Sequence, residues 1–231
     1  MRKVRPIDIA RKLNISTSSL RGYEERGLIP PTDRTENGYR IYTEEHVAYF
    51  ECIVGMAPAF GMDSTSRILL DIQNKDVHAA LWRINKVQVE NHHAKTTLHQ
   101  IICLVKELEV QPAIERTFMI GEIAEKIGVA HSTLRYWEKE GFISSARGEE
   151  NNYRYFDVFQ YIKILLMKAT QNTVYSNETV KIKNAVKKLR EKDLLAVKEI
   201  IVDIERYLNN NNRLQLQGLS LLHQLCAKLG L

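Results

Sequence analysis

Two short stretches of the sequence, SSLRGYEERGLI and STLRYWEKEGFI, carry the same kinds of side chain at the same spacing. Arg21 and Arg135 occupy matched places in them. A guanidinium group donates two parallel hydrogen bonds, which suits a phosphate group or the major-groove edge of guanine. Hydroxyl groups beside it can bind further phosphate oxygens. The two stretches therefore predict contacts to double-stranded DNA.

The candidate DNA-binding residues form two matched sets. The first set is Ser18, Ser19, Arg21, Tyr23, Arg34, Tyr39 and Arg40. The second set is Ser132, Thr133, Arg135, Tyr136, Arg147, Tyr153 and Arg154. We favour DNA contacts over a solvated surface for the arginines, because both stretches keep them in the same local frame. For Tyr23 and Trp137, packing into the core is the competing interpretation.

An internal repeat underlies these two sets. Leu134 lies 114 positions after Leu20, and the same offset relates residues from Ile9 and Ile123 to Arg40 and Arg154. We expect this offset to hold without a gap, since chance similarity would scatter its matches. The chain therefore carries a duplicated module.

Within each copy, the pattern predicts a helix-turn-helix followed by a hairpin wing. In the first copy, one helix spans 7–13 and a second spans about 18–26, with Gly27 at its C-terminal cap. Asn37-Gly38 predicts a two-residue hairpin turn. Asn151-Asn152 takes this place in the second copy, because asparagine tolerates left-handed backbone geometry.

Further helices are expected at about 44–56 and 64–72, and then a much longer one. From Val77 to Leu108 apolar or small residues keep heptad spacing, broken only by Asn91, so this segment predicts a coiled-coil strand. A second seam runs from Leu194 to Leu208, and the asparagines at 209–212 are expected to interrupt it. A separate amphipathic helix should follow and pack on the coiled coil or on a partner.

Composition excludes several classes of protein. The net charge of +5 is mild, and the three cysteines lie far apart, so no disulfide framework is predicted and a reducing cytoplasm fits. We predict neither export nor a membrane span. No catalytic motif, cofactor-binding loop or convincing metal site occurs; His92 with His99, and His223 with Cys226, are better explained as surface residues.

The stretches LRGYEERGLI with RTENGYRIY, and LRYWEKEGFI with ENNYRYF, resemble the DNA-binding domain of the MerR family of bacterial transcription regulators. The resemblance covers about 7–72 and 120–189. It implies winged-helix domains, a long antiparallel coiled coil, and dimeric binding that distorts promoter DNA. It marks as DNA contacts Arg21, Tyr23, Arg40, Arg135, Tyr136 and Arg154.

This sequence departs from the family pattern in three ways. Gly22 replaces the aromatic residue that Tyr136 supplies in the second copy, and glycine also weakens a helix. The places where metal sensors of the family carry cysteines hold other residues. Family members usually have one such domain per chain, whereas this chain has two.

The fold expected is mainly α, with two winged helix-turn-helix domains joined by long helices that form an antiparallel coiled coil. The domains predicted are 1–75 and 114–190, with coiled-coil helices at 76–110 and within 191–231. A helix from Val77 to Leu108 would be roughly 50 Å long, so it would carry the second copy to the far end of the coiled coil. The chain is then an intramolecular pseudo-dimer; an ordinary homodimer is the alternative.

The function predicted is a sequence-specific, double-stranded DNA-binding transcription regulator without enzyme activity. Because the two recognition helices differ, the operator should be asymmetric. RNA polymerase at a promoter is a candidate partner, and the location expected is the bacterial cytoplasm, in association with the nucleoid. The alternatives are a DNA-architectural protein, either excisionase-like or chromosome-organising, and a small-molecule sensor, for which too little chain follows the coiled coil.

Overall fold

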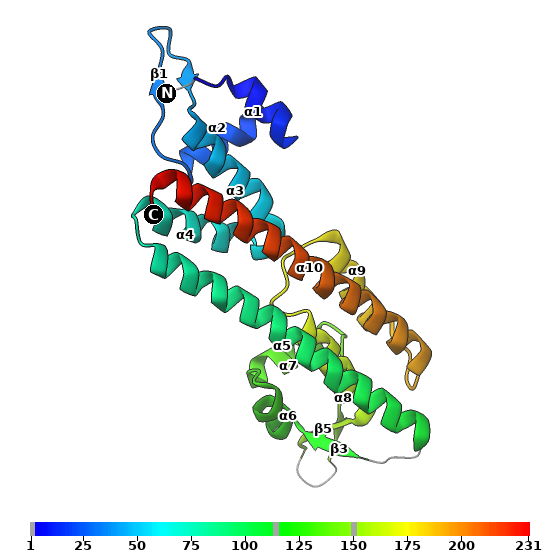
Figure 1. Cartoon of the computed structure of the whole chain (residues 1–231). Coiled ribbons are helices and arrows are strands. Elements are labelled where there is room, and N and C mark those ends of the chain that lie inside the picture. The colour runs from blue at the N-terminus through cyan, green and yellow to red at the C-terminus, as the bar shows by residue number, and fades with distance from the viewer. Residues whose placement is uncertain (1–2, 113–115, 149–151) are drawn as a thin grey trace. The chain divides into compact units, whose positions relative to one another are not determined.

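The computed structural model describes residues 3–112, 116–148 and 152–231, and it is mainly α-helical (Figure 1). The chain divides into two compact units. Unit 1 consists of Met1–Val89 and Asn210–Leu231, and unit 2 consists of Glu90–Asn209. Each unit contains one copy of the repeat. No helix of the described residues is long and apolar enough to cross a membrane.

Unit 1 begins with the predicted helix-turn-helix. Helix α1 (Pro6–Leu13) starts with a proline, which suits the first helical position because its missing N–H would have no partner there. Asn14 ends α1 in the left-handed conformation, with φ of 52°. Helix α2 (Thr17–Glu25) follows, and the Ser16 side chain caps it by accepting a hydrogen bond from the Ser19 amide.

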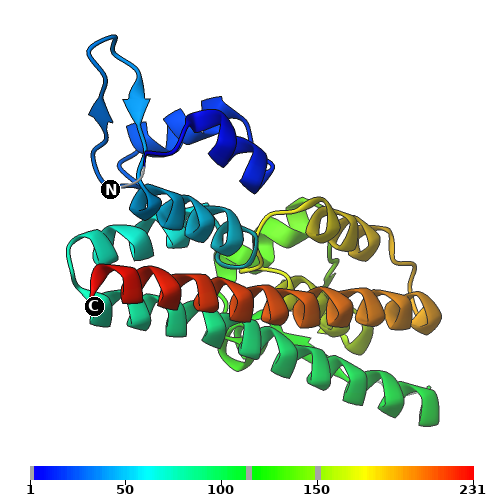
Figure 2. The same cartoon turned by 45° about the horizontal axis from the view of Figure 1, so that its top comes forward.

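The wing of unit 1 is a hairpin of strands β1 (Asp33–Arg34) and β2 (Arg40–Ile41), which projects from the helices of that unit (Figure 2). The predicted two-residue turn is wrong. The Thr35 amide donates to the Tyr39 carbonyl and the Gly38 amide to the Thr35 carbonyl, each at 2.8 Å, so the loop contains residues 36–38. Only Gly38 in this loop has a positive φ, at 77°, which is typical of a three-residue hairpin loop.

Helices α3 (Glu44–Phe60) and α4 (Met62–Gln73) complete the first copy, and α3 extends one turn beyond the predicted end. Phe50, Ile53 and Met56 of α3 are fully buried, as are Ile68 and Leu69 of α4. These side chains form the core on which α2 and the wing rest.

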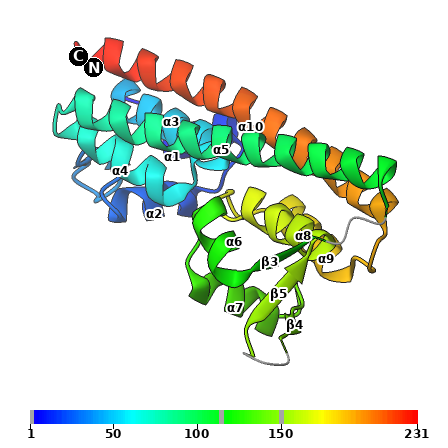
Figure 3. The same ribbon diagram turned by 90° about the horizontal axis from the view of Figure 1, so that it is seen from below.

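Unit 2 repeats this arrangement with a fuller sheet (Figure 3). Its elements are β3 (Thr117–Met119), α6 (Ile120–Ile127), α7 (His131–Lys139), β4 (Ala146–Arg147), β5 (Arg154–Asp157), α8 (Val158–Ala169) and α9 (Asn177–Lys188). The strands are antiparallel in the order β3-β5-β4. In unit 1 the single bridge between Val4 and Tyr42 takes the place of the β3–β5 pairing.

Strand pairing shows that the offset of 114 fails in one strand of the wing. Arg34 pairs with Arg40, and Arg147 pairs with Arg154, so Arg34 and Arg147 are equivalent although they lie 113 positions apart. The second copy has one residue fewer before this strand and one more in the loop after it, where insertions are tolerated. Asn151 lies outside the described residues, and Asn152 has a φ of 55°.

Two long helices contribute to both units: α5 (Val77–Val110) and α10 (Leu194–Leu229). In unit 1, Ala80 and Ile84 of α5 join the same core as Leu222 and Leu225 of α10. In unit 2, the seam residues of the two helices share the other core; they are Leu98, Ile101, Val105, Val197, Ile201, Ile204 and Leu208. The predicted seams therefore face the interior of each unit.

The asparagine run does not interrupt α10, which is helical from Leu194 to Leu229. The predicted break is wrong because asparagine costs only about 0.7 kcal/mol per residue in a helix relative to alanine. Packing outweighs that cost, since Leu208 before the run and Leu222 and Leu225 after it are buried. The predicted separate C-terminal helix is the end of α10.

Helix α10 packs closely on α3 through two glycines. A Cβ atom at Gly218 would lie 3.0 Å from Met56 Cγ and 3.3 Å from Phe60 Cε2, and one at Gly55 would overlap Leu221 Cδ1 at 2.2 Å. We therefore expect Gly218→Leu to destabilise unit 1 by about 1–3 kcal/mol through overpacking. Thermal denaturation followed by circular dichroism would measure the loss; an unchanged melting temperature would contradict this packing.

Gly22→Ala should instead increase the stability of the protein. Gly22 lies within α2, and a Cβ atom there would meet nothing within 4 Å. Alanine favours a helix over glycine by about 1 kcal/mol, so this variant should melt at a higher temperature than the parent protein. A decrease would show that a neighbouring group fills the space beside Gly22.

Candidate nucleic-acid interface

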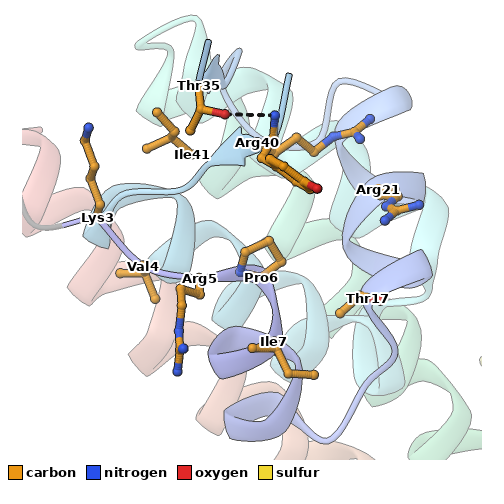
Figure 4. Close-up of a pocket in the computed structure, with 11 residues that line it drawn as sticks. Lys3, Val4, Arg5, Pro6, Ile7, Thr17, Arg21, Thr35, Arg40 and Ile41 are labelled. Atoms are coloured by element: carbon orange, nitrogen blue, oxygen red, sulfur yellow. Dashed lines mark hydrogen bonds between the residues drawn. The ribbon is translucent and has the colours of Figure 1, made fainter. Parts of the chain in front are cut away.

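A basic groove lies in unit 1 between the N-terminal segment, α2 and the wing (Figure 4). It has a volume of about 500 Å³, and its charged lining residues are Lys3, Arg5, Arg21 and Arg40. No carboxylate is among the described residues that line it. A groove with only positive groups attracts an anion such as a DNA phosphate.

The four cations of the groove differ in whether a carboxylate already binds them. Arg5 binds Asp8 of the adjoining helix α1 through two hydrogen bonds of 2.7 and 3.0 Å, so much of its charge is already neutralised. Arg21 projects from the exposed face of α2. Arg40 is part of an ion pair with Glu24. Arg21 and Lys3 are therefore the cations best placed to meet an added anion.

A carboxylate of α2 holds the wing in place. Arg40 Nε donates to Glu24 Oε2, and the Thr32 hydroxyl donates to Glu24 Oε1. The carboxylate is half-buried, and a second nitrogen of Arg40 lies 3.9 Å from Glu25 on the solvent side. We call this contact the wing brace. It joins α2 to Thr32, which precedes β1, and to Arg40 of β2.

The second copy has an equivalent wing brace. Arg154 Nε donates to Glu138 Oε2 at 2.7 Å, and the Ser145 hydroxyl donates to Glu138 Oε1. Ser145 lies 113 positions after Thr32, which is the shifted offset that the strand pairing shows. Both arginines of the predicted site thus use Nε to fix the wing.

The environment lowers the pKa of both carboxyl groups. Burial raises the pKa of Glu24, but hydrogen bonds from Thr32 and Arg40, together with the charge of Arg40, lower it further than burial raises it. The same balance lowers the pKa of Glu138, with Ser145 and Arg154 as the partners. Each carboxylate is therefore ionised at neutral pH, as the brace requires.

The hydroxyl residues differ between the copies. Ser18 Oγ and Ser19 Oγ lie 2.6 and 2.9 Å from Ser16 Oγ, so in the first copy they belong to the cap of α2. In the second copy Ala130 occupies the cap position and makes no side-chain cap, while Ser132 is exposed. The predicted hydroxyl contacts are thus arranged differently at the two helix starts.

The aromatic candidates separate into exposed and packed residues. Tyr39, Tyr136 and Tyr153 are 73%, 57% and 61% exposed. The ring of Tyr23 instead packs on the core with its centroid 6.4 Å from that of Phe50, and Trp137 is buried. Core packing, the alternative for these last two rings, agrees with their positions.

The other wing arginines point along the hairpin. Arg34 Nη1 donates to the Gly38 carbonyl at 3.3 Å, and Arg147 Nη1 donates to the Asn152 carbonyl at 3.1 Å. Both side chains are exposed. Each therefore supports the wing loop and presents its remaining donors to solvent.

No group of three or more metal-ligating side chains occurs within the described ranges of the chain. His92, His99 and His223 are exposed. Burial raises the pKa of the Cys52 thiol to about 12, which keeps it protonated. These residues offer no metal centre and no reactive thiolate at Cys52.

Sequence reasoning missed the residues that build the wing brace. Glu24 and Glu138 were visible as a matched pair in the repeat, but nothing in the sequence alone showed that each would face an arginine sixteen positions later. Thr32 and Ser145 were hidden because they do not share the 114 offset. Lys3 precedes the repeat, so the matched pattern does not include it.

We expect Glu24→Gln to loosen the wing of unit 1. A carboxylate whose pKa is lowered on folding stabilises the fold above its ordinary pKa of 4.5, and this contribution is lost as the pH falls through the lowered value. The variant should be less stable than the parent at neutral pH, by about 1 kcal/mol, and the difference should disappear in acid. Denaturant unfolding at a series of pH values would measure it.

Glu36→Gln is the matched control, since Glu36 is an exposed carboxylate of the same wing. It should leave stability unchanged throughout the series. A pH-independent loss in Glu24→Gln would mean that its charge does not act through the brace.

Comparison with known proteins finds one family model that matches a segment of each copy. The family model for "MerR family regulatory protein" matches residues 5–42 and 120–156. The chain is 48% identical to the HTH-type transcriptional regulator CueR of Salmonella typhi over 40 residues, which are 17% of this chain and 29% of that protein. CueR of Vibrio cholerae is 51% identical over 39 residues, 17% of this chain and 28% of that protein.

A longer match is to the HTH-type transcriptional regulator ZntR homolog of Haemophilus influenzae. It is 29% identical over 131 residues, which are 55% of this chain and 93% of that protein. The chain thus spans less than a third of these CueR proteins and nearly all of the ZntR homolog. No solved structure matches the chain.

Proposed function

We propose that the chain, two segments of which match the model for MerR family regulatory proteins, is a transcription regulator that binds double-stranded DNA through both of its winged helices. The observation that carries this proposal is the matched pair of braced recognition elements. Each copy presents an exposed arginine, Arg21 or Arg135, on a helix tied to a wing by a half-buried carboxylate. A rigid helix with an adjoining wing suits the major groove and its flanking phosphates.

The proposed DNA contacts are the fourteen residues predicted from the sequence, and their roles differ. Arg21, Arg135, Tyr136 and the wing-tip residues Tyr39 and Tyr153 are exposed and would make direct contacts. Arg40 and Arg154 would contact phosphate with the nitrogens that the wing brace leaves available. Tyr23 would contribute mainly through packing.

We further propose that the chain acts as an intramolecular pseudo-dimer. In unit 2, Lys95 Nζ lies 2.5 Å from Glu205 and Lys198 pairs with Glu109, so residue numbers rise along α5 as they fall along α10. That direction is the one expected for an antiparallel coiled coil. The apolar seams of α5 and α10 are buried within the chain, which leaves them unavailable to a second copy.

The operator of such a molecule would be asymmetric. The two recognition helices present Gly22 and Tyr136 at one matched position, and Arg26 and Glu140 at another. Unlike side chains favour unlike half-sites. The proposal implies that the operator lies in promoter DNA and that RNA polymerase is a further partner.

Light scattering would test the pseudo-dimer directly. Free protein should have the mass of one 26.7 kDa chain, and the complex with operator DNA should contain one chain per site. An obligate dimer whose long helices pair only between chains would rule it out. Selection from random DNA should yield an asymmetric site, and a perfect palindrome would count against this arrangement.

Arginine variants would test DNA binding. Arg21→Ala and Arg135→Ala should each weaken operator binding by about 1–3 kcal/mol if they contact bases, or lower the salt slope of binding by about one if they contact phosphate. Arg213→Ala removes an exposed arginine of α10 and should change neither quantity. Fluorescence anisotropy over a range of salt concentrations would measure both. Equal effects of all three variants would mean that net charge alone drives binding.

Mapping of binding sites in cells would separate regulation from DNA architecture. A regulator should occupy a few sites at promoters. Occupancy of many genomic sites without promoter bias would favour the architectural function instead.

A further inference from the structure

The segments that follow α4 and α9, beside the ends of the two recognition helices, differ in net charge. In the first copy the matched positions are Glu25 and Arg26 at the end of α2, with 73–76 at the end of α4 and beyond it, and their charges sum to zero. In the second copy Lys139 and Glu140 at the end of α7 also cancel, and the segment up to the cap of α10, 187–193, reads Lys-Lys-Leu-Arg-Glu-Lys-Asp, which gives a sum of +2. One copy of a duplicated fold has therefore become basic at a place where the other is neutral.

Side-chain positions match Gln73 with Lys187, and the caps of α5 and α10 match Asp76 with Asp193, so the second-copy segment is three residues longer. In unit 1, Gln73 Nε2 donates to the Gly27 carbonyl at 3.0 Å, immediately after α2. In unit 2, Lys187 Cε lies 3.7 Å from the Cβ position of Gly141, and Lys187 Nζ lies 5.4 Å from the ring centroid of Phe142. Both side chains thus reach the residues that follow the recognition helix. Lys139 is the last residue of α7, two positions before Gly141.

These charges are available to a partner. Lys139, Lys187, Lys188 and Arg190 are exposed, and within the described residues none of them takes part in an ion pair. By contrast, Glu25 in the first copy lies 3.9 Å from Arg40. Exposed cations of this kind attract an anion.

We infer that this basic cluster, Lys139, Lys187, Lys188 and Arg190, binds the phosphate backbone of DNA at the edge of the groove that α7 enters. The inference rests on the proposed function. In homeodomains the C-terminal end of the recognition helix contacts the DNA backbone, and Lys139 and Lys187 lie at the corresponding end of α7. The first copy lacks the cluster, so the second half of the operator is held by additional contacts that do not depend on sequence.

Phosphate is the chemistry that fits best. Three of the four side chains are lysines, which act as point charges with no hydrogen-bond acceptor. They suit phosphate oxygens and cannot distinguish base pairs by a pattern of donors and acceptors. Additional affinity on one side would also give the asymmetric operator a fixed direction of binding.

The test uses the full chain with the first-copy residues installed in the second copy: Lys139→Glu, Lys187→Gln and Lys188→Asn together. Binding to the operator and to an unrelated duplex would be measured by fluorescence anisotropy over a range of salt concentrations. We expect the salt slope to fall by about 0.9 for each phosphate that the variant no longer neutralises, and affinity for both duplexes to fall at least tenfold at moderate salt. Hydroxyl-radical footprinting should show weaker protection beside the second half-site alone.

Lys106→Gln, an exposed lysine of α5 in the same unit, is the control and should leave the slope unchanged. Because Lys187 packs on Phe142, the double variant Lys139→Glu with Lys188→Asn repeats the test without disturbing that contact. Unchanged slope and footprint in both variants would overturn the inference and direct attention to an acidic protein as the partner. Loss of DNA binding in Arg135→Ala but not in these variants would leave the proposed function intact, so the two failures are distinguishable.

Discussion

Each winged-helix domain completes its apolar core with side chains from two long helices that lie outside it in the sequence. In unit 1, Ile84 and Leu225 join the core of the first copy, and in unit 2, Leu98 and Ile204 join that of the second. A module of about 70 residues buries little surface by itself, so these contributions matter for its stability. The position of every recognition residue therefore depends on helices that carry no recognition residue.

The wing brace fixes the orientation of the wing at the surface of each domain. A hairpin with two-residue strands has too few ladder hydrogen bonds to hold its own orientation. The half-buried carboxylates of Glu24 and Glu138 supply the missing constraint, since each joins the recognition helix to an arginine of the wing and to a hydroxyl before it. The helix and the wing are thus fixed relative to each other, which would reduce the entropy lost in the DNA binding that we propose.

Much of this arrangement could be predicted from the sequence, because its signals are periodic or local. The helix-turn-helix, the wing and the seam from Val77 to Leu108 all follow from spacing and from Gly27 as a helix stop. The failures concern competition between local preference and packing. Asn37-Gly38 predicts a two-residue turn, but the hydrogen bonds of Thr35 close a three-residue loop. The asparagines near 210 predict a break, but burial of Leu208 and Leu225 favours a continuous helix. The wing brace could not be predicted, since it depends on contacts between distant residues.

Both winged helices belong to one covalent chain, which changes how they respond to concentration and to mutation. When such domains come from separate chains, dilution can leave each without its counterpart. Here their number stays equal however little protein a cell contains, and their concentration relative to each other is set by the connecting helices. A single substitution also changes one domain and leaves the other as it was. The charge difference between the segments that follow α4 and α9 is the kind of divergence that this independence permits.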